Sequence, residues 1–245
     1  MSFILTTFVL HYLDCYNMSI YDSLLQIPLF KGLSINSFNE IIEKYKFEFL
    51  SYKKGDVIIK AGETCDCFKF IISGCVRSEL ISEKVKIKLY ETITAPNDII
   101  SNYALGNNIF PVTVTACNDN TGILVIKKQD FLSIMQEQRV VMLNYLIYLS
   151  RKSQIPSEAY NLIASDNIRA KFALWILFFT NYNSSEIVIK AKLRDLYLFF
   201  GVQRGMFNSI LEEMKGLNIL DFSVKEITIL DRRLLMSYYR EQCEK

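Results

Sequence analysis

The side chains best suited to recognise another molecule gather between residues 192 and 209. Four polar side chains follow a glycine-containing turn there: Gln203, Arg204, Asn208 and Ser209. Arginine can pair bidentately with guanine in the major groove of DNA, and glutamine or asparagine can pair with adenine. Lys192 and Arg194, slightly upstream, are suited to phosphate oxygens. The grouping predicts contacts to the bases and backbone of double-stranded DNA.

The surrounding apolar pattern predicts a helix-turn-helix that would position these side chains. Leu193, Leu196 and Phe200 mark the inner face of a short first helix, and Gly201 permits a left-handed turn. Val202 could fill the angle between the helices. The second helix, beginning near Arg204, has a buried face made of Phe207, Ile210, Leu211 and Met214. A plain helical hairpin inside a core would show the same pattern.

The residues that follow favour DNA binding over the plain hairpin. Residues 218–222 and 227–230 are typical of two short strands around a turn at residues 223–225. Such a pair would form a wing beside the recognition helix, with Lys225 near the DNA backbone. A wing after a helix-turn-helix is much less common by accident than either part alone.

Two other sequence patterns, one typical of strands and one of helices, precede this region. Residues 50–128 read as short strands rich in β-branched and aromatic residues with glycines between them, which predicts a small sandwich or jelly roll. A short helix is predicted at 131–135 and a long one from about Val140. Pro156 should kink the long helix or divide it in two.

The apolar stripe of the long helix is broad enough to cover more than its own domain. Met142, Leu146 and Leu149 recur at helical spacing. Such a helix either packs on its own domain or forms a two-helix seam with a second chain.

A hinge is predicted at residues 165–166, with Asp166 capping the next helix. That helix would bury one face, made of Ile168, Phe172, Trp175, Ile176 and Phe179. A short strand candidate follows at 186–190.

Composition excludes several classes of function. The net charge is only +2, although residues 187–211 carry four basic side chains against Asp195 alone. One histidine and the absence of P-loop, G-x-S-x-G, H-E-x-x-H and dinucleotide motifs argue against an enzyme. The six cysteines are scattered, and Cys65-x-Cys67 is too tightly spaced for zinc, so no metal is predicted. Free thiols in a reducing cytosol are the simplest interpretation. The alternative is an iron–sulfur or redox-sensing role, although the clustered four-cysteine spacing of such sites is missing.

The N-terminal segment leaves two possibilities open. Residues 3–13 are apolar but too short to span a bilayer, and they lack the flanks of a signal peptide. Residues 1–17 are either native or an extension upstream of a start at Met18.

Taken together, these segments resemble the cAMP receptor protein/FNR (Crp/Fnr) family of bacterial regulators. LLQIPLFKGLS (residues 24–34) looks like the family's first helices, and YKKGDVIIKAGETCDCFKFIISGCVR (52–77) like its first β-roll strands. LRDLYLFFGVQRGMFNSILEEMKGLNIL (193–220) is similar to its winged helix-turn-helix.

The resemblance implies an α+β chain of three parts. These are a cyclic-nucleotide-binding-like β-roll at 18–135, a dimerisation helix and hinge at 138–165, and a winged helix-turn-helix at 166–245. It also implies a cytoplasmic homodimer that binds a palindromic DNA site as a transcription regulator, with RNA polymerase as a further partner and no membrane contact. Met142, Leu146 and Leu149 would lie at the dimer seam.

Departures from the family affect the ligand most. In APNDIISNYALGNNIFPVTVTAC (residues 95–117), residues 101–102 stand where cAMP-binding members have Gly-Glu, and residues 110–111 replace Arg-Ser. Loss of the arginine removes the charge-assisted contact to the cyclic phosphate. We therefore expect no cAMP or cGMP in the usual mode and predict no cofactor. The region is either a pocket for a neutral or apolar ligand or a filled core; a pocket would involve Asn102, Tyr103, Phe110 and Thr113.

The recognition helix departs as well. Arg204 is kept, but Gly205 replaces a common glutamate, Ser209 replaces a second arginine, and Val224 stands where the wing turn often has glycine. The DNA sequence bound should therefore differ from the cAMP receptor consensus. The alternative function, from another class, is a cyclic-nucleotide-responsive regulatory subunit without DNA binding.

Overall fold

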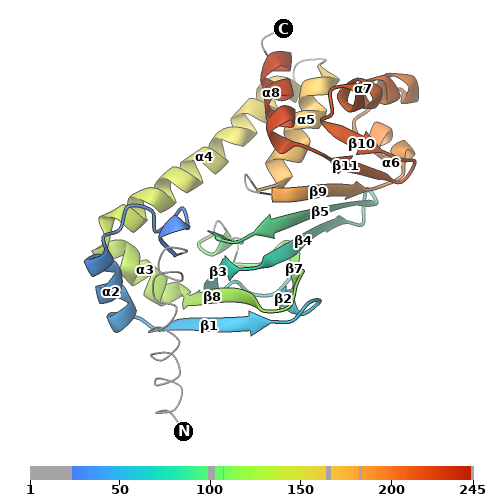
Figure 1. Cartoon of the computed structure of the whole chain (residues 1–245). Coiled ribbons are helices and arrows are strands. Elements are labelled where there is room, and N and C mark those ends of the chain that lie inside the picture. The colour runs from blue at the N-terminus through green and yellow to red at the C-terminus, as the bar shows by residue number, and fades with distance from the viewer. Residues whose placement is uncertain (1–23, 99–102, 107, 164–166, 182–183, 244–245) are drawn as a thin grey trace.

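The computed structural model describes residues 24–98, 103–106, 108–163, 167–181 and 184–243, and they form an α+β chain (Figure 1). The proposed alternative start and Asp166 lie outside these residues. The elements are, in chain order, α2 (Ile35–Lys44), β1 (Phe47–Tyr52), β2 (Val57–Ile59), β3 (Cys67–Ser73), β4 (Cys75–Ser82), β5 (Ile87–Thr94), β6 (Asn97–Asp98), β7 (Thr113–Ala116), β8 (Thr121–Lys127), α3 (Lys128–Glu137), α4 (Arg139–Ile163), α5 (Ile168–Phe179), β9 (Ser184–Lys190), α6 (Leu193–Phe199), α7 (Arg204–Gly216), β10 (Leu220–Phe222), β11 (Glu226–Ile229) and α8 (Arg232–Cys243).

The strands form two antiparallel sheets. The smaller has the order β1-β8-β3-β6, and the larger, of seven strands, has the order β10-β11-β9-β5-β4-β7-β2. Alternating burial along β5 and β7 fits strands with one face in a core. The strands predicted between residues 57 and 127 are present. Strand β1 was missed, because none of its residues is fully buried and its burial shows no clear alternation.

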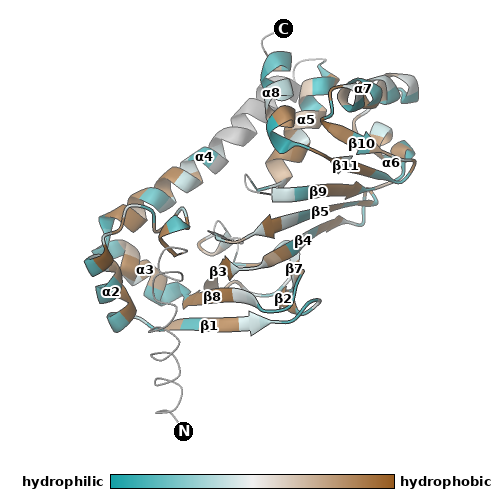
Figure 2. Cartoon of the chain, in the orientation of Figure 1, coloured by the Kyte–Doolittle hydropathy of each residue, from teal (hydrophilic) through white to brown (hydrophobic). Residues whose placement is uncertain are grey.

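The N-terminal core lies between these sheets and is closed by α2, α3 and the start of α4. Its centre is a set of phenylalanine rings at close quarters, with Phe68 and Phe131 having centroids 4.0 Å apart and Phe30 and Phe70 5.3 Å apart. Figure 2 shows hydrophobic residues on the strands of both sheets and along the first half of α4. Burial of this aromatic surface is the main stabilising term of the N-terminal half.

The seven-stranded sheet continues from the N-terminal half into the C-terminal half. β5 pairs with β9 in antiparallel register, with Leu89 opposite Ile189 and Glu91 opposite Ile187. Ile87 and Leu89 of β5 are buried in the second hydrophobic core, with α5, α7 and α8, while Ile93 of the same strand belongs to the first. A single strand thus contributes to both cores.

A polar pair marks the point at which the strands pass from one core to the other. Ser78 on β4 lies opposite Glu91 on β5, and both are buried. The Glu91 carboxylate accepts hydrogen bonds from the backbone and side-chain amides of Asn181 at 2.7 and 3.0 Å and from the Ser184 hydroxyl at 2.6 Å. These bonds compensate the cost of burying the carboxylate and fix the segment between α5 and β9 to the N-terminal half.

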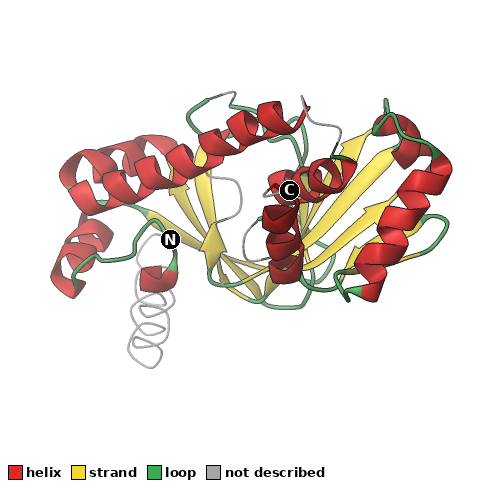
Figure 3. Cartoon of the chain, turned by 90° about the horizontal axis from the view of Figure 1, so that it is seen from above, coloured by secondary structure: helices red, strands yellow, loops and turns green. Residues whose placement is uncertain are grey.

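The long helix α4 crosses from the N-terminal to the C-terminal half along one side of the molecule (Figures 1 and 3). It runs without interruption from Arg139 through Pro156 to Ile163. Of the two effects expected of Pro156, the division of the helix is therefore wrong, and the kink stays a prediction. The proline removes one backbone hydrogen bond, and the remaining bonds on both sides keep the segment helical. Among the described residues, no helix is both long and apolar enough to cross a bilayer.

Helix α5 differs from expectation in its cap and in part of its buried face. Asn167 is the N-cap, and its side-chain oxygen accepts from the amide of Ala170 at 3.2 Å. Of the predicted face, Ile168, Phe172 and Ile176 are buried, whereas Trp175 is half-buried and Phe179 is 41 % exposed.

Because Glu91 satisfies several donors at the junction of the two cores, its loss should weaken the whole fold. We expect Glu91→Ala to lower the free energy of unfolding by about 2 kcal/mol, since the half-buried donors of Asn181 and Ser184 lose a charged acceptor. Urea titration followed by circular dichroism measures this. Glu83→Ala, at the exposed β4–β5 turn, is the control and should change stability little. Equal effects of the two substitutions would contradict the role given to Glu91.

Candidate nucleic-acid interface

Residues 193–216 form two helices joined by a tight turn. Helix α6 ends at Phe199, Gly201 adopts a φ of +66°, and α7 begins at Arg204 with Gln203 as its N-cap. Leu196, Phe207, Ile210, Leu211 and Met214 are fully buried. The ring of Phe172 on α5 contacts those of Phe200 and Phe207, with centroids 5.5 and 5.3 Å apart. This packing sets the angle between α6 and α7, with the half-buried Val202 beside it.

The predicted base-reading residues lie at the free end of α7. Gln203, Arg204 and Ser209 are exposed, and Asn208 is half-buried. The Gln203 side chain makes no capping bond to α7. Gly205 is exposed too, as is Met206 at 46 %, which the sequence pattern did not single out. An exposed methionine beside Arg204 offers an apolar contact, such as one to a thymine methyl group.

The strands β10 and β11 form a hairpin directly after α7, and its turn is tied to the start of α6. The amide of Ala191 donates to the carbonyl of Lys225 at 3.0 Å, and that of Leu193 to the carbonyl of Val224 at 3.2 Å. These two bonds bring Lys192 and Lys225, which are predicted to contact the DNA backbone, close together. Both lysines are exposed. Arg194, in the first turn of α6, is also exposed.

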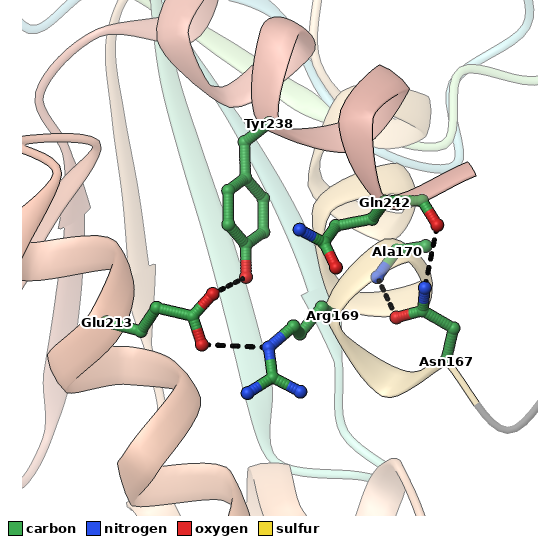
Figure 4. Close-up of polar contacts among 6 residues, drawn as sticks. All are labelled: Asn167, Arg169, Ala170, Glu213, Tyr238 and Gln242. Carbon is green, nitrogen blue, oxygen red and sulfur yellow. Dashed lines mark hydrogen bonds and ion pairs between the residues drawn. The ribbon is translucent and has the colours of Figure 1, made fainter. Parts of the chain in front are cut away.

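Polar contacts hold α7 against the rest of the C-terminal half (Figure 4). The Glu213 carboxylate accepts from Arg169 Nε on α5 at 2.8 Å and from the Tyr238 hydroxyl on α8 at 2.9 Å. Burial, together with the bond to Glu213, raises the pKa of Tyr238 above its ordinary value, so this hydroxyl remains a donor. At the same, C-terminal end of α7, Lys215 Nζ lies 2.8 Å from Asp221 Oδ1 and lowers the pKa of that carboxyl. Three elements thus position the helix.

The residues predicted for an effector pocket differ in how deeply they are buried. Phe110 is buried in the N-terminal core, and Tyr103 is packed against that core. Thr113 is half-buried, and its hydroxyl accepts from the amide of Ala61 at 3.2 Å. Asn102 lies outside the described residues.

Phe110 stands at the position where a cyclic nucleotide would meet an arginine in the family that the sequence resembles. Its amide donates to Glu63 at 3.0 Å and its carbonyl accepts from Gly62 at 2.8 Å, so both backbone groups are used within the protein. Pro111 next to it has no amide proton. A buried aromatic ring followed by a proline does not fit the phosphate of a cyclic nucleotide.

The first half of α4 carries an exposed apolar stripe. Leu143, Leu146 and Ile147 are 53 %, 53 % and 48 % exposed, and Met142 and Val140 are also exposed. Leu149, predicted for the same stripe, is half-buried and packs against the N-terminal core, with Val141 and Tyr145 on the same side. Leu143 and Ile147 were missed, because apolar residues occur on both sides of this helix and spacing alone does not separate them.

Among the described residues, no group of three histidine, cysteine, aspartate or glutamate side chains could hold a metal ion. Cys65 is buried, which raises the pKa of its thiol to about 11. The cysteines within the described residues are free thiols: Cys65, Cys67, Cys75, Cys117 and Cys243.

Comparison with known proteins gives a family model and a fold. Residues 49–138 match the cyclic nucleotide-binding domain. The catabolite activator protein of Thermus thermophilus has 16% sequence identity over 88% of this chain and 99% of its own, with a TM-score of 0.50. Curated protein sequences give no match.

Two other solved structures cover most of the chain with lower TM-scores. They are DNR from Pseudomonas aeruginosa (18% identity, 89% of this chain and 96% of its own, TM-score 0.44) and a protein from Eubacterium rectale described as a transcriptional regulator of the Crp/Fnr family (19%, 87% and 98%, 0.46). The family match and the Thermus fold confirm the predicted α+β architecture, with an N-terminal antiparallel β-sandwich of the cyclic nucleotide-binding type followed by helices in the C-terminal half.

Proposed function

We propose that this protein, which has a cyclic nucleotide-binding domain at residues 49–138 within a fold of the Crp/Fnr type, is a sequence-specific DNA-binding transcription regulator. The observation that supports it most directly is the exposed N-terminal end of α7, with Gln203 and Arg204 free at its tip and a wing beside it. A helix whose N-terminal residues are exposed in this way can enter the major groove. The protein would act in the cytoplasm as a regulator without catalytic activity, with RNA polymerase as its further partner.

The division of labour among the polar residues follows from their positions. Gln203, Arg204, Asn208 and Ser209 would contact base edges, and Lys192, Arg194 and Lys225 would contact phosphates on either side. Base contacts carry sequence discrimination, whereas phosphate contacts set affinity and register. The chain would comprise a sensor at 18–135, a dimerisation helix at 138–165 and a DNA-binding domain at 166–245.

Arg204 should carry discrimination at one base pair of the site. We expect Arg204→Ala to reduce the preference for that base pair by about 1–3 kcal/mol. Arg194→Ala, which removes the same charge, should weaken binding similarly for all sequences. Selection of bound sequences from a randomised duplex library, followed by fluorescence anisotropy, measures both. A wild-type protein that selects no sequence would refute the proposed function.

We also infer that the protein acts as a homodimer joined along α4. The exposed side of this helix is apolar at Val140, Leu143, Leu146 and Ile147, at spacings of three and four residues. Exposed leucine and isoleucine at this spacing form the seam of two-helix packings. Met142 and Leu146 of the predicted seam lie on this surface, and Leu149 would support the helix from the inner side. A two-fold dimer would present two α7 helices to a palindromic site.

Charged residues in this stripe should separate the dimer. The double variant Leu143→Glu/Ile147→Glu is expected to sediment as a monomer and to lose binding to a full palindrome. The control Leu50→Glu/Val57→Glu changes two side chains that are 40 % and 55 % exposed on the N-terminal sheets, and should remain dimeric. Sedimentation velocity distinguishes them; a wild-type monomer at micromolar concentration would rule out the seam.

The sensor is proposed to respond to a signal other than cAMP or cGMP. The alternative, a cyclic-nucleotide-responsive regulatory subunit without DNA binding, is favoured by the match to the cyclic nucleotide-binding domain alone. The buried Phe110 and the adjacent Pro111 weigh against it. In a sensor for another signal, a site for a neutral or apolar ligand would be lined by Asn102, Tyr103, Phe110 and Thr113. Otherwise the same residues would complete a filled core.

Calorimetry separates these two functions. We expect no heat of binding when cAMP or cGMP is titrated to millimolar concentration, because no guanidinium is available at position 110 for the phosphate. The variant Phe110→Arg/Pro111→Ser serves as a positive comparison if it folds, as judged by its urea transition. Micromolar binding to the wild type would favour the alternative.

A further inference from the structure

An open groove of about 500 Å³ lies where the β4–β5 hairpin meets the wing. Its lining includes five lysines and one glutamate: Lys86, Lys88, Lys190, Lys192, Lys225 and Glu226. Two of the lysines come from the hairpin of the N-terminal half, and the others come from the winged half. In Figure 1 the segments that line the groove lie next to α6, at the end of the large sheet where β4 and β9 end and β5 and β11 begin.

The pairing of β5 with β9 forces like charges together in this groove. Lys88 lies directly opposite Lys190, so both side chains project from the same face of the sheet. Like charges that face each other across two strands destabilise a sheet. Lys86 precedes Lys88 by two residues and Lys192 follows Lys190 by two, so in this antiparallel pair both lie at the same end of the strands, and each is exposed.

The groove contains little negative charge to offset these lysines. Glu226 lies opposite Lys190 on β11, and its Oε2 is 3.8 Å from Lys190 Nζ. Lys190 Nζ also lies 5.3 Å from the ring centroid of Tyr90. Among the residues that line the groove, one carboxylate therefore serves five ammonium groups. Such a surface attracts a polyanion.

The position of the groove identifies the polyanion. Lys192 and Lys225 are already proposed to contact DNA phosphates, and backbone bonds tie the wing turn to the start of α6. Lys86 and Lys88 extend the same basic surface onto the N-terminal half. All five lysines are exposed. An open row of flexible point charges fits the phosphates along a polymer and lacks the fixed, forked donors suited to one small anion.

We propose that Lys86 and Lys88 of the sensor hairpin bind phosphates of the DNA backbone, so that the DNA interface includes the N-terminal half of the chain. This inference rests on the proposed function, and it adds a contact outside the winged helix-turn-helix. Both halves would then touch the same duplex while β5 and β9 remain paired.

The salt dependence of DNA binding tests this proposal. Each phosphate contact contributes about 0.9 to the slope of log Kd against log salt, so Lys86→Gln/Lys88→Gln, which removes two contacts from each protomer of the proposed dimer, should lower the slope by about 3.6 on a palindromic duplex. Lys86→Arg/Lys88→Arg should keep the wild-type slope, because the charge is retained. The matched control Lys53→Gln/Lys54→Gln alters two exposed lysines at the β1–β2 turn and should also leave the slope unchanged. Base preference should be the same in all four proteins.

The outcomes separate this proposal from the proposed function. A wild-type protein without DNA binding would refute the function, whereas wild-type binding with an unchanged slope in Lys86→Gln/Lys88→Gln would overturn only the hairpin contact. Urea unfolding of each variant without DNA checks the fold, and loss of the Lys88–Lys190 opposition should raise the midpoint of the glutamine variant.

Adding inorganic phosphate at constant ionic strength tests a free anion as the occupant. A phosphate-induced rise in the urea midpoint of the wild type that is absent from the glutamine variant, together with an unchanged DNA slope, would assign the groove to a free anion. That result would also overturn the proposal.

Discussion

The pairing of β5 with β9 is the interaction on which the arrangement of this molecule depends. It converts the hairpin of the N-terminal roll and the strands of the winged half into one seven-stranded sheet. Without β5, strand β9 would have an unpaired edge, with exposed backbone donors and acceptors. The pairing satisfies those groups and, through Ile87 and Leu89, completes the core beneath α5 and α7.

This continuity constrains how a signal at the N-terminal half could reach the surface proposed to bind DNA. The two halves are joined both by α4 and by the shared sheet, so the winged half is held at two places. Any movement of α7 relative to the N-terminal half must either move the β4–β5 hairpin together with the winged half or separate β5 from β9. The Glu91 carboxylate, bound to Asn181 and Ser184 at the junction, adds hydrogen bonds that such a separation would break.

The same sheet has two faces with opposite character. Its inner face is apolar and belongs to the two cores, whereas its outer face near the wing is basic. The lysines of that face come from segments more than a hundred residues apart in the sequence, such as Lys88 and Lys190. Strand pairing alone brings them together, and it does so at the edge of the surface proposed to meet DNA.

Much of the fold was determined by local sequence signals. The turn at Gly201, the start of α7 at Arg204 and the hairpin after it follow from the need for a left-handed residue, amphipathic spacing and two short β-rich runs. These are short-range properties, so the sequence could predict the helix-turn-helix and its exposed polar residues. The α+β class and the order of its parts followed in the same way.

The tertiary structure decided what depends on distant partners. Spacing could not show which side of α4 faces solvent, because both sides are apolar and only the packing of Val141 and Tyr145 against the N-terminal core distinguishes them. It could not show that Phe110 is buried, that Asn167 caps α5, or that α4 continues through Pro156. Nor could spacing show that Lys86 and Lys88 lie beside the wing. The register between β5 and β9, which belong to different halves of the chain, is set by the packing of both cores and not by either strand alone.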